Sequence, residues 1–238
     1  MYKNISKLLK IKNGDIISIT GCGGKTTLMN KLAKELRNKG RVLICTSTKI
    51  KRSTNKEADF IYDSFTDYEK VKDKNIIVAI GKLLPQKNKL SSITEHDINS
   101  IKKDFDYIII EADGCRNLPL KMWKSHEPVI YNISNKNIAV FSAKTIDRKI
   151  EEDFIYNYAE FKKVIEDRFV NEDVFLKLIN SNPGPFKNFN KEKFVFFNQV
   201  ETKNERTRVR EVISYLKNNT EGIKYISGSL LEEEYYED

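Results

Sequence analysis

Residues 15–48, "DIISITGCGGKTTLMNKLAKELRNKGRVLICTST", carry the clearest indication of the fold class. It begins with an apolar and β-branched run at 15–20, which is typical of a buried strand. After a glycine-rich turn, Leu28, Leu32 and Leu36 recur at helical spacing, and Gly40 ends the predicted helix. A second apolar run at 41–48 completes strand, loop, helix and strand within about 30 residues, the size of a βαβ unit.

The same alternation continues along the chain and predicts a three-layer α/β fold with a mostly parallel sheet. Further strands are expected at 75–81, 106–114, 137–143, 193–201 and 223–227, with helices at 94–105 and 204–217. Residues 151–190 are predicted to be a helical insertion that ends at the turn-rich "NSNPGPFKNF". We expect one domain over 1–238, similar to P-loop NTPases, and low complexity only in the acidic tail "EEEYYED".

Composition excludes several classes of protein. With 39% hydrophobic and 32% charged residues, and no apolar run near the roughly 20 residues that cross a bilayer, we expect no membrane segment. No signal peptide precedes the first strand, so a cytoplasmic location is expected. The net charge of +8 comes from lysines spread over the whole chain, which makes nucleic acid an unlikely partner. Cys22, Cys45 and Cys115 lack CxxC spacing and are expected to be small residues in a reducing compartment.

The glycine-rich turn at 21–27 predicts a phosphate-binding loop. The strict pattern fails, because Ile19 stands where the first glycine is required. The context is nevertheless right, since backbone amides at a helix start attract phosphate after a buried strand. The shortened form Gly-x-x-Gly-Lys-Thr-Thr resembles the loop of P-loop enzymes such as the Mur ligases. The residues expected to bind nucleotide here are Gly21, Cys22, Gly23, Gly24, Lys25, Thr26 and Thr27, with Lys25 on the β and γ oxygens and the Thr26 hydroxyl on Mg²⁺.

Two neighbouring strand ends supply candidates for the metal and the γ-phosphate. In "YIIIEADG", Glu111 and Asp113 lie two residues apart, and one is expected to hold Mg²⁺ while the other positions a water, with capping of the following turn by both as the alternative. Asp113 resembles the aspartate that ends a Walker B strand. In a parallel sheet the next strand ends at the same crevice, so a response to the γ-phosphate is predicted for Thr46, Ser47, Thr48 and Lys49, with a plain loop as the alternative.

The segment "FFNQVE" resembles the Asn-Lys-x-Asp guanine signature with two departures. Asn198 and Glu201 have donors and acceptors that match guanine, whereas Gln199 replaces the lysine and Glu201 is longer than aspartate. The preference between ATP and GTP therefore stays open, and a simple strand-to-helix turn is the alternative.

The block "EADGCRNLPLKMWKSHEPVI", residues 111–130, departs from generic NTPases. Arg116 follows the metal strand directly and is predicted to sense or stabilise phosphate. Candidates for a substrate or switch contact are Lys121, His126 and Glu127, and a plain turn is the alternative for the last two. No histidine–cysteine cluster has metal-ligand spacing.

Together, "TGCGGKTTL", "TSTK", the 111–130 block and "FNQVE" resemble the YqeC family over nearly the whole chain. Family members usually carry Ala where Cys22 stands and Ser where Cys115 stands. The resemblance implies an accessory role in maturing a selenium-dependent molybdenum hydroxylase, with that enzyme or its cofactor as partner.

Three functions remain open from the sequence. The favoured one is a P-loop NTPase that uses Mg²⁺ with ATP or GTP, in which Lys25, Glu111, Asp113 and Arg116 are catalytic. A small-molecule kinase or Mur-like ligase is the second, and a non-catalytic nucleotide sensor is the third.

Overall fold

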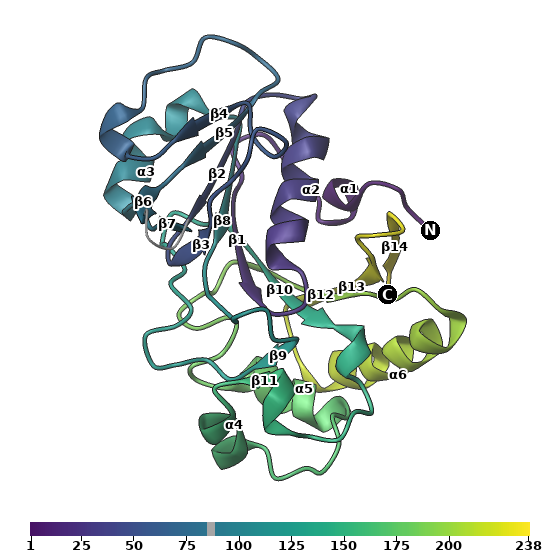
Figure 1. The fold of residues 1–238 in the computed structure, drawn as a ribbon. Helices are drawn as coiled ribbons and strands as arrows, with labels where there is room; N and C mark the ends of the chain where they lie inside the picture. The colour runs from purple at the N-terminus through teal and green to yellow at the C-terminus, as the bar shows by residue number, and fades with distance from the viewer. Residues whose placement is uncertain (85–88) are drawn as a thin grey trace.

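The computed structural model describes residues 1–84 and 89–238, which form an α/β molecule around a large twisted sheet (Figure 1). Neighbouring strands of this sheet are parallel, except that β14 runs antiparallel to β13. In spatial order the strands are β14 (Glu234–Glu237), β13 (Ile223–Ser229), β12 (Glu192–Asn198), β10 (Lys136–Ser142), β1 (Ile16–Gly21), β8 (Tyr107–Glu111), β2 (Val42–Thr46), β5 (Ile77–Ile80) and β4 (Phe60–Tyr62).

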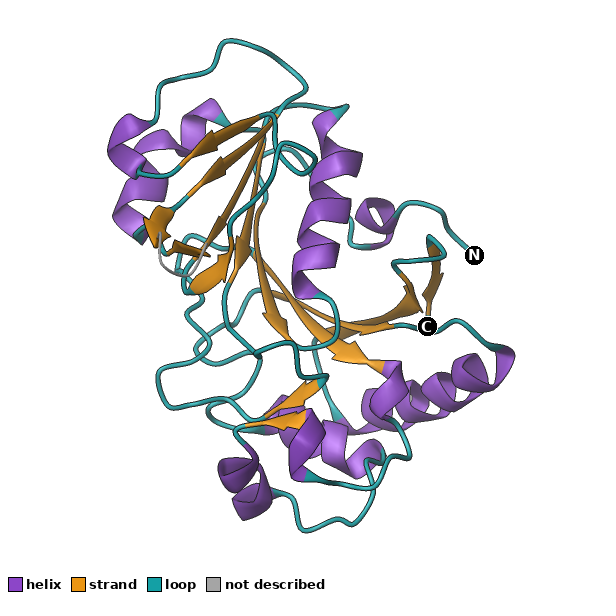
Figure 2. Ribbon diagram, viewed as in Figure 1, coloured by secondary structure: helices purple, strands orange, loops and turns teal. Residues whose placement is uncertain are grey.

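Helices cover both faces of the sheet and complete three layers (Figure 2). On one face lie α1 (Ile5–Leu8) and α2 (Lys25–Arg37), whose apolar residues share a core with β1, β8 and β10. On the other face α3 (Glu95–Ile101) packs on β2, β5 and β8, while α4 (Tyr158–Val164), α5 (Glu172–Asn180) and α6 (Lys203–Asn219) pack near β10 and β12. The predicted three-layer α/β fold is therefore confirmed.

Alternation along β8 decides which side of the sheet its polar end reaches. Ile109 joins the core under α2, whereas Ile108 and Ile110 join the core under α3. Because successive side chains point to opposite faces, Glu111 lies on the α2 side, where the helix begins. The alternation along β8 therefore places the Glu111 carboxylate near the start of α2.

Two small sheets that the sequence did not predict lie beside the loops that follow the main strands. One has the order β3 (Lys49–Lys51), β7 (Lys89–Ser91) and β6 (Lys82–Leu84), with antiparallel pairs. The other pairs β9 (Leu120–Lys121) with β11 (Ile155–Tyr156) in parallel. They are too short to carry a periodic signal, since their strands span three residues or fewer.

The acidic tail is a structured edge strand, which its composition did not indicate. Residues 234–237 form β14, and Tyr235 is fully buried in the core beneath α1 and α2. The neighbouring glutamates remain at the surface, where an antiparallel edge strand tolerates charge. Burial of Tyr235 therefore favours a strand at this position, although the composition of the segment is acidic.

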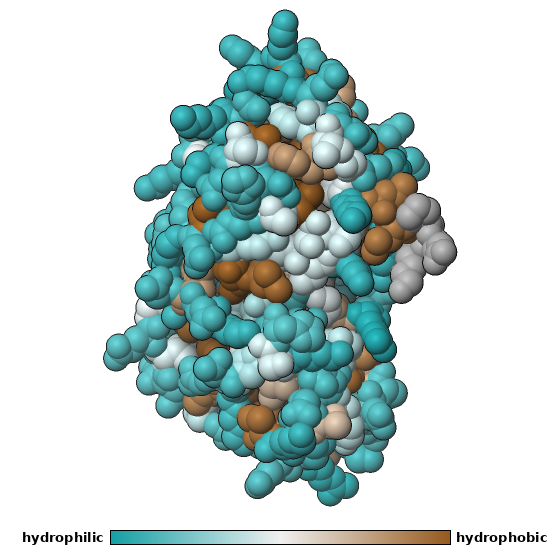
Figure 3. All heavy atoms as spheres, turned by 90° about the vertical axis from the view of Figure 1, so that its left-hand side faces the viewer, coloured by the Kyte–Doolittle hydropathy of each residue, from teal (hydrophilic) through white to brown (hydrophobic). Residues whose placement is uncertain are grey.

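Helix starts follow the sequence signals closely. Thr94 caps α3, and Asp97 completes a capping box. Helices α4 and α5 lie within the segment predicted to be an insertion, while the assignment of a single domain stays a prediction. In the described part of the chain no helix is long and apolar enough to cross a membrane. The face drawn in Figure 3 is largely hydrophilic, with apolar residues in small separate groups.

Candidate functional site

A cleft of about 1520 Å³ opens at the carboxyl ends of β1, β2, β8 and β12. It brings together most of the predicted site, although these residues come from distant parts of the chain. The predicted residues that line it are Gly23, Gly24, Lys25, Thr26, Thr27, Ser47, Thr48, Lys49, Glu111, Arg116, His126, Glu127, Asn198, Gln199 and Glu201. The other predicted residues are buried and do not line it: Gly21, Cys22, Thr46, Asp113 and Lys121.

The loop before α2 needs glycine for two reasons. Gly23 and Gly24 have φ angles of 92° and 127°, which side chains rarely adopt. A Cβ at Gly23 would lie 2.8 Å from the backbone nitrogen of Ser142, and one at Gly24 would lie 2.5 Å from Asn198 Nδ2. The glycines therefore let the loop pack tightly against β10 and the end of β12.

The start of α2 is open to an anion. Gly24 is its N-cap and offers no side-chain cap, and the first turn contains no acidic residue. The helix ladder begins where the Leu28 amide donates to the Gly24 carbonyl, at 2.8 Å. The preceding residues line the cleft, so their amide groups and the positive end of the helix dipole suit a phosphate there.

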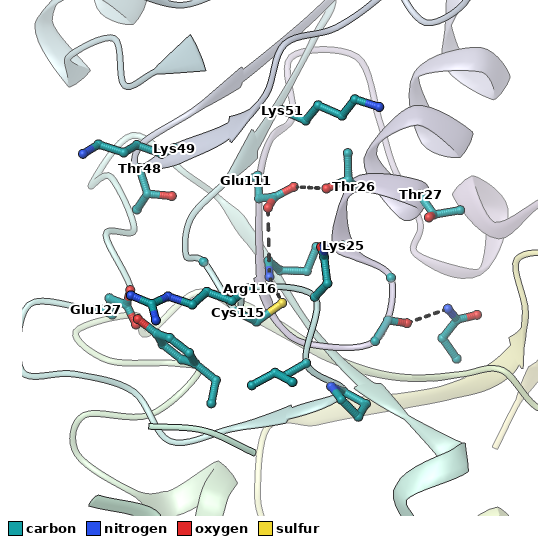
Figure 4. Close-up of a pocket in the computed structure, with 18 of the residues that line it drawn as sticks. Lys25, Thr26, Thr27, Thr48, Lys49, Lys51, Glu111, Cys115, Arg116 and Glu127 are labelled. Carbon is teal, nitrogen blue, oxygen red and sulfur yellow. Dashed lines mark hydrogen bonds and ion pairs between the residues drawn. The ribbon is translucent and has the colours of Figure 1, made fainter. Parts of the chain in front are cut away.

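Lys25 is buried in a ring of acceptors at the floor of the cleft (Figure 4). Its Nζ donates to the Gly21 carbonyl at 2.7 Å and lies 3.2 Å from Asp113 Oδ1 and 4.0 Å from Glu111 Oε1. Burial alone would lower the pKa of Lys25, but the charges of Asp113 and Glu111 outweigh it and raise this pKa. Lys25 therefore stays a cation in the folded protein.

Glu111 and Thr26 form the oxygen pair that best suits a magnesium ion. The Thr26 hydroxyl donates to Glu111 Oε2 at 2.7 Å, and burial raises the pKa of Glu111. Mg²⁺ is usually bound by one or two carboxylates together with substrate phosphates and waters. The described residues contain no cluster of three or more His, Cys, Asp or Glu able to hold a metal, so an ion here would need phosphate oxygens as ligands.

Asp113 is placed differently from the metal ligand that its sequence context suggested. It is fully buried, accepts from the Gly21 amide at 3.0 Å and from Trp123 Nε1 at 2.5 Å, and does not line the cleft. Burial would raise the pKa of Asp113, but Lys25 and Lys121 reverse this effect and hold it low. The geometry therefore favours Glu111 over Asp113 as the metal carboxylate.

A buried chain of alternating charges runs from the loop to the far side of the 111–130 block. Asp113 Oδ2 lies 3.2 Å from Lys121 Nζ, which is 3.0 Å from Glu127 Oε2 and donates to the Gly114 carbonyl at 2.7 Å. Lys121 and Glu127 thus have structural partners, and His126 is exposed beside the cleft. Asp113 thus has two cationic neighbours, Lys25 and Lys121.

The hydroxyl groups of the residues at the end of β2 and just after it mostly form hydrogen bonds with backbone carbonyls. Thr46 Oγ1 donates to the Glu111 carbonyl at 2.8 Å, and Ser47 Oγ donates to the Val129 carbonyl at 2.6 Å. The exposed Lys49 and the partly exposed Thr48 face the cleft. Of the four residues predicted to respond to a γ-phosphate, these two are the most available.

The three residues predicted to contact the base all have protein partners. Asn198 Nδ2 donates to the Gly23 carbonyl at 2.7 Å, and its Oδ1 accepts from the Leu230 amide at 3.0 Å. Gln199 accepts from Ser142, and Glu201 pairs with Lys144 at 2.9 Å. Asn198 therefore stabilises the loop through its hydrogen bond to Gly23. Guanine recognition stays a prediction.

Sequence reasoning missed the chemistry of one thiol. Cys115 Sγ lies 3.4 Å from Lys25 Nζ, and a hydrogen bond from Cys22 together with the Lys25 charge lowers its pKa to about 6. It also missed Lys51 and Lys89, which line the cleft, and Tyr156, whose ring lies 5.7 Å below the Arg116 guanidinium. Isolated lysines and a tyrosine distant in sequence carry no local pattern that would reveal them.

The chain is similar to known proteins over much of its length. The sequence model of the family described as YqeC protein matches residues 17–159, more than half of the chain. This span contains the loop, the end of β8 and the charge chain through Glu127, but not Asn198. The uncharacterized protein YqeC of Escherichia coli (strain K12) is 29% identical over 184 residues, which cover 74% of this chain and 72% of that protein.

Proposed function

The chain belongs to the YqeC family, and we propose that it is a P-loop NTPase that binds ATP or GTP with Mg²⁺. One observation carries the proposal. Lys25 and Thr26 stand at an uncapped helix start after a buried strand, and the Thr26 hydroxyl donates to Glu111 from the neighbouring strand. A lysine, a hydroxyl and a carboxylate in this arrangement match what a magnesium-bound triphosphate requires.

Each residue has a distinct task in this proposal. The amides of Gly24 to Thr27 and the Lys25 ammonium bind phosphate oxygens, and Glu111 with Thr26 would hold the metal. Mg²⁺ would supply charge neutralisation at the β and γ oxygens. Asp113 and Lys121 are positioning residues, because they orient the loop through Gly21 and keep the buried charges paired. Arg116 is exposed at the rim of the cleft, and in this proposal its guanidinium stabilises the negative charge that develops during phosphoryl transfer.

We further propose that this activity serves the maturation of a selenium-dependent molybdenum hydroxylase. The support is the resemblance of the 111–130 block to the YqeC family, together with membership of that family. Within the block, Lys121 and Glu127 connect the phosphate lysine to a loop at the cleft, which is where a response to nucleotide would reach a partner.

A second candidate function is transfer of the γ-phosphoryl group to a small molecule, as in a kinase or ligase. The specific observation in its favour is the size of the cleft, which at about 1520 Å³ exceeds the roughly 300–1,000 Å³ of common ligand pockets. Hydrolysis and transfer share the same phosphate site and differ in what receives the phosphoryl group.

Phosphate release from Mg-ATP and Mg-GTP tests the proposal directly. We expect turnover by the wild type, alone or stimulated by a hydroxylase preparation, and none by Lys25→Ala. Lys203→Ala on the exposed face of α6 is the matched control and should keep full turnover. Binding without turnover under every condition would favour a nucleotide sensor, and equal turnover by Lys25→Ala would exclude the site.

A further inference from the structure

The small sheet of β3 and β7 presents lysines to the cleft. In this antiparallel pair Lys49 lies opposite Ser91, and Lys51 lies opposite Lys89. These four residues line the cleft, whereas Leu90, which alternates with them along β7, is buried. Strand alternation therefore places the three lysines on one face of the small sheet, the face that borders the cleft.

Together with Arg116, these lysines form a basic wall, defined as Lys49, Lys51, Lys89 and Arg116. All four are exposed, and none has an ion pair with another described residue. The carboxylates of the cleft already have cationic partners, in the pairs Glu111 with Lys25, Glu127 with Lys121 and Glu201 with Lys144. The basic wall is thus a source of positive charge that no carboxylate of the described residues neutralises.

The arrangement within the wall is unfavourable without a counterion. Like charges directly opposite each other on paired strands destabilise a sheet, and Lys51 faces Lys89 in this way. Figure 4 shows the side chains of Lys49 and Lys51 extending in different directions, as unneutralised charges on one strand face would. An anion between these side chains would remove the repulsion and satisfy several donors at once.

The cleft also has space for more than one ligand. Its volume of about 1520 Å³ exceeds the roughly 300–1,000 Å³ of pockets that hold a single drug-sized molecule. The phosphate loop and the basic wall both line this cleft, the wall with residues from β3, from β7 and from the segment after β8. A ligand bound at the wall would therefore lie beside one bound at the loop.

We propose that the basic wall binds a second, anionic small molecule that carries phosphate or carboxylate groups, next to the nucleotide. This inference rests on the proposed function, because the second ligand is defined relative to a nucleotide on the loop. A nucleic acid is a poorer match, since its electrostatic footprint is a basic stripe along a surface, whereas these cations line a hollow.

Calorimetric titration with two probes, citrate and glycerol 3-phosphate, tests the site. The protein is first saturated with Mg²⁺ and a non-hydrolysable ATP or GTP analogue, so that the phosphate loop is filled. The test variant is Lys51→Gln/Lys89→Gln, and the control with the same change of charge is Lys203→Gln/Lys217→Gln on exposed α6 positions. Each charge-assisted contact is worth about tenfold in affinity.

We expect at least one probe to bind the wild type and the control equally, and to bind the test variant roughly tenfold or more weakly. Affinity for the analogue should be retained in the test variant, and thermal unfolding should show that both variants fold. Failure of both probes to bind, equal binding by the test variant, or competition between probe and analogue would overturn the proposal. So would binding of a single-stranded oligonucleotide through these lysines when neither small anion binds.

Lys25→Ala separates this inference from the proposed function. We expect this variant to lose the analogue and to keep the probe, because Lys25 is buried and paired with Asp113, whereas Lys51 and Lys89 are exposed and have no ion pair with a described residue. A wild type that binds the probe but no nucleotide would support the anion site and contradict the NTPase. Loss of probe and analogue together in Lys25→Ala would show that there is one site, and would overturn the second ligand.

Discussion

The charged side chains on the loop side of the cleft are buried and paired, whereas those of the basic wall are exposed and have no ion pair with a described residue. On the loop side, Lys25, Asp113 and Lys121 are buried and hold one another at 3.2 Å. On the basic wall, Lys51 and Lys89 are exposed, face each other and have no carboxylate partner among the described residues. The charges of the loop side are therefore neutralised within the protein, whereas those of the basic wall are not neutralised by any described residue.

This difference follows from the cost of removing a charge from water. A buried ion must be paired and hydrogen-bonded, so the loop side is fixed in one arrangement by the fold itself. Exposed lysines remain hydrated, so the repulsion between Lys51 and Lys89 costs the protein little stability. The cleft therefore combines a loop side whose charges are buried and paired with a basic wall whose charges are exposed.

The largest effect is expected from Asp113→Ala, which removes the shared carboxylate and leaves two lysines buried. Breaking a buried ion pair in this way costs about 3–5 kcal/mol of unfolding free energy. Urea denaturation measures it, with the exposed Asp73→Ala as a control expected to stay within about 0.5 kcal/mol. A loss below about 1 kcal/mol for Asp113→Ala would mean that the loop side is not held together by its charges.

A smaller effect is expected from Glu111→Gln, which keeps the Thr26 contact but removes the charge next to the metal position. Apparent Mg²⁺ affinity in the presence of nucleotide should fall about ten- to hundredfold, since hydrogen bonds to charged groups are worth about 1.5–3 kcal/mol. A Mg²⁺ titration of thermal stability at fixed nucleotide measures this, with the exposed Glu232→Gln as control. Unchanged Mg²⁺ dependence would remove Glu111 from the metal site.

The Cys115 thiol reports on the Lys25 charge. Its pKa of about 6 lies below the ordinary 9.0, so the reactive thiolate should accumulate as pH rises through 6 and be nearly complete by pH 8. Alkylation by iodoacetamide, followed by mass spectrometry, should therefore level off above pH 7. In Lys25→Ala the profile should shift to higher pH. Burial raises the pKa of Cys45 to about 12, so that thiol is the unreactive internal control.

A rate of Cys115 alkylation that keeps rising up to pH 9 in the wild type would contradict this account of the thiol. An identical profile in wild type and Lys25→Ala would show that the Lys25 ammonium does not act on Cys115, despite the 3.4 Å that separates Nζ from Sγ.

The smallest effect is expected on the basic wall. Lys51→Gln removes one of two opposed ammonium groups, so unfolding free energy should stay within about 0.5 kcal/mol of the wild type or rise slightly. Urea denaturation with Lys203→Gln as control measures it. A loss above about 1 kcal/mol would mean that Lys51 has a structural partner and that the wall is not a free anion site.

Much of the main sheet could be predicted because buried parallel strands read as continuous apolar runs, as at 106–111 and 192–198. The start of α2 could also be predicted, since a glycine-rich turn followed by apolar residues at helical spacing is typical of a helix that begins after a loop. Strands β3, β7 and β14 were missed, because strands of three or four residues depend on tertiary pairing and carry little pattern.

The candidate site was predictable in its members more than in their tasks. Glu111 and Asp113 were found from their position after β8, but spacing alone could not show that Asp113 turns into a cage of Gly21, Lys121 and Trp123. In the same way, base recognition by Asn198 stays a prediction, and the sequence pattern could not show that its amide also donates a hydrogen bond to the loop. Short-range pattern places a residue near a site, and long-range contacts decide what it does there.

The central claim is that the loop at 21–27 binds nucleotide phosphate. Its most direct test is calorimetric titration of the wild type and of Lys25→Ala with Mg-ATP and Mg-GTP analogues, with Lys203→Ala as the matched control. We predict binding of at least one nucleotide by the wild type and the control, and a loss of about tenfold or more in Lys25→Ala, whose charge-assisted phosphate contacts are gone. Absence of nucleotide binding by the wild type, or equal affinity in a folded Lys25→Ala, would contradict the account.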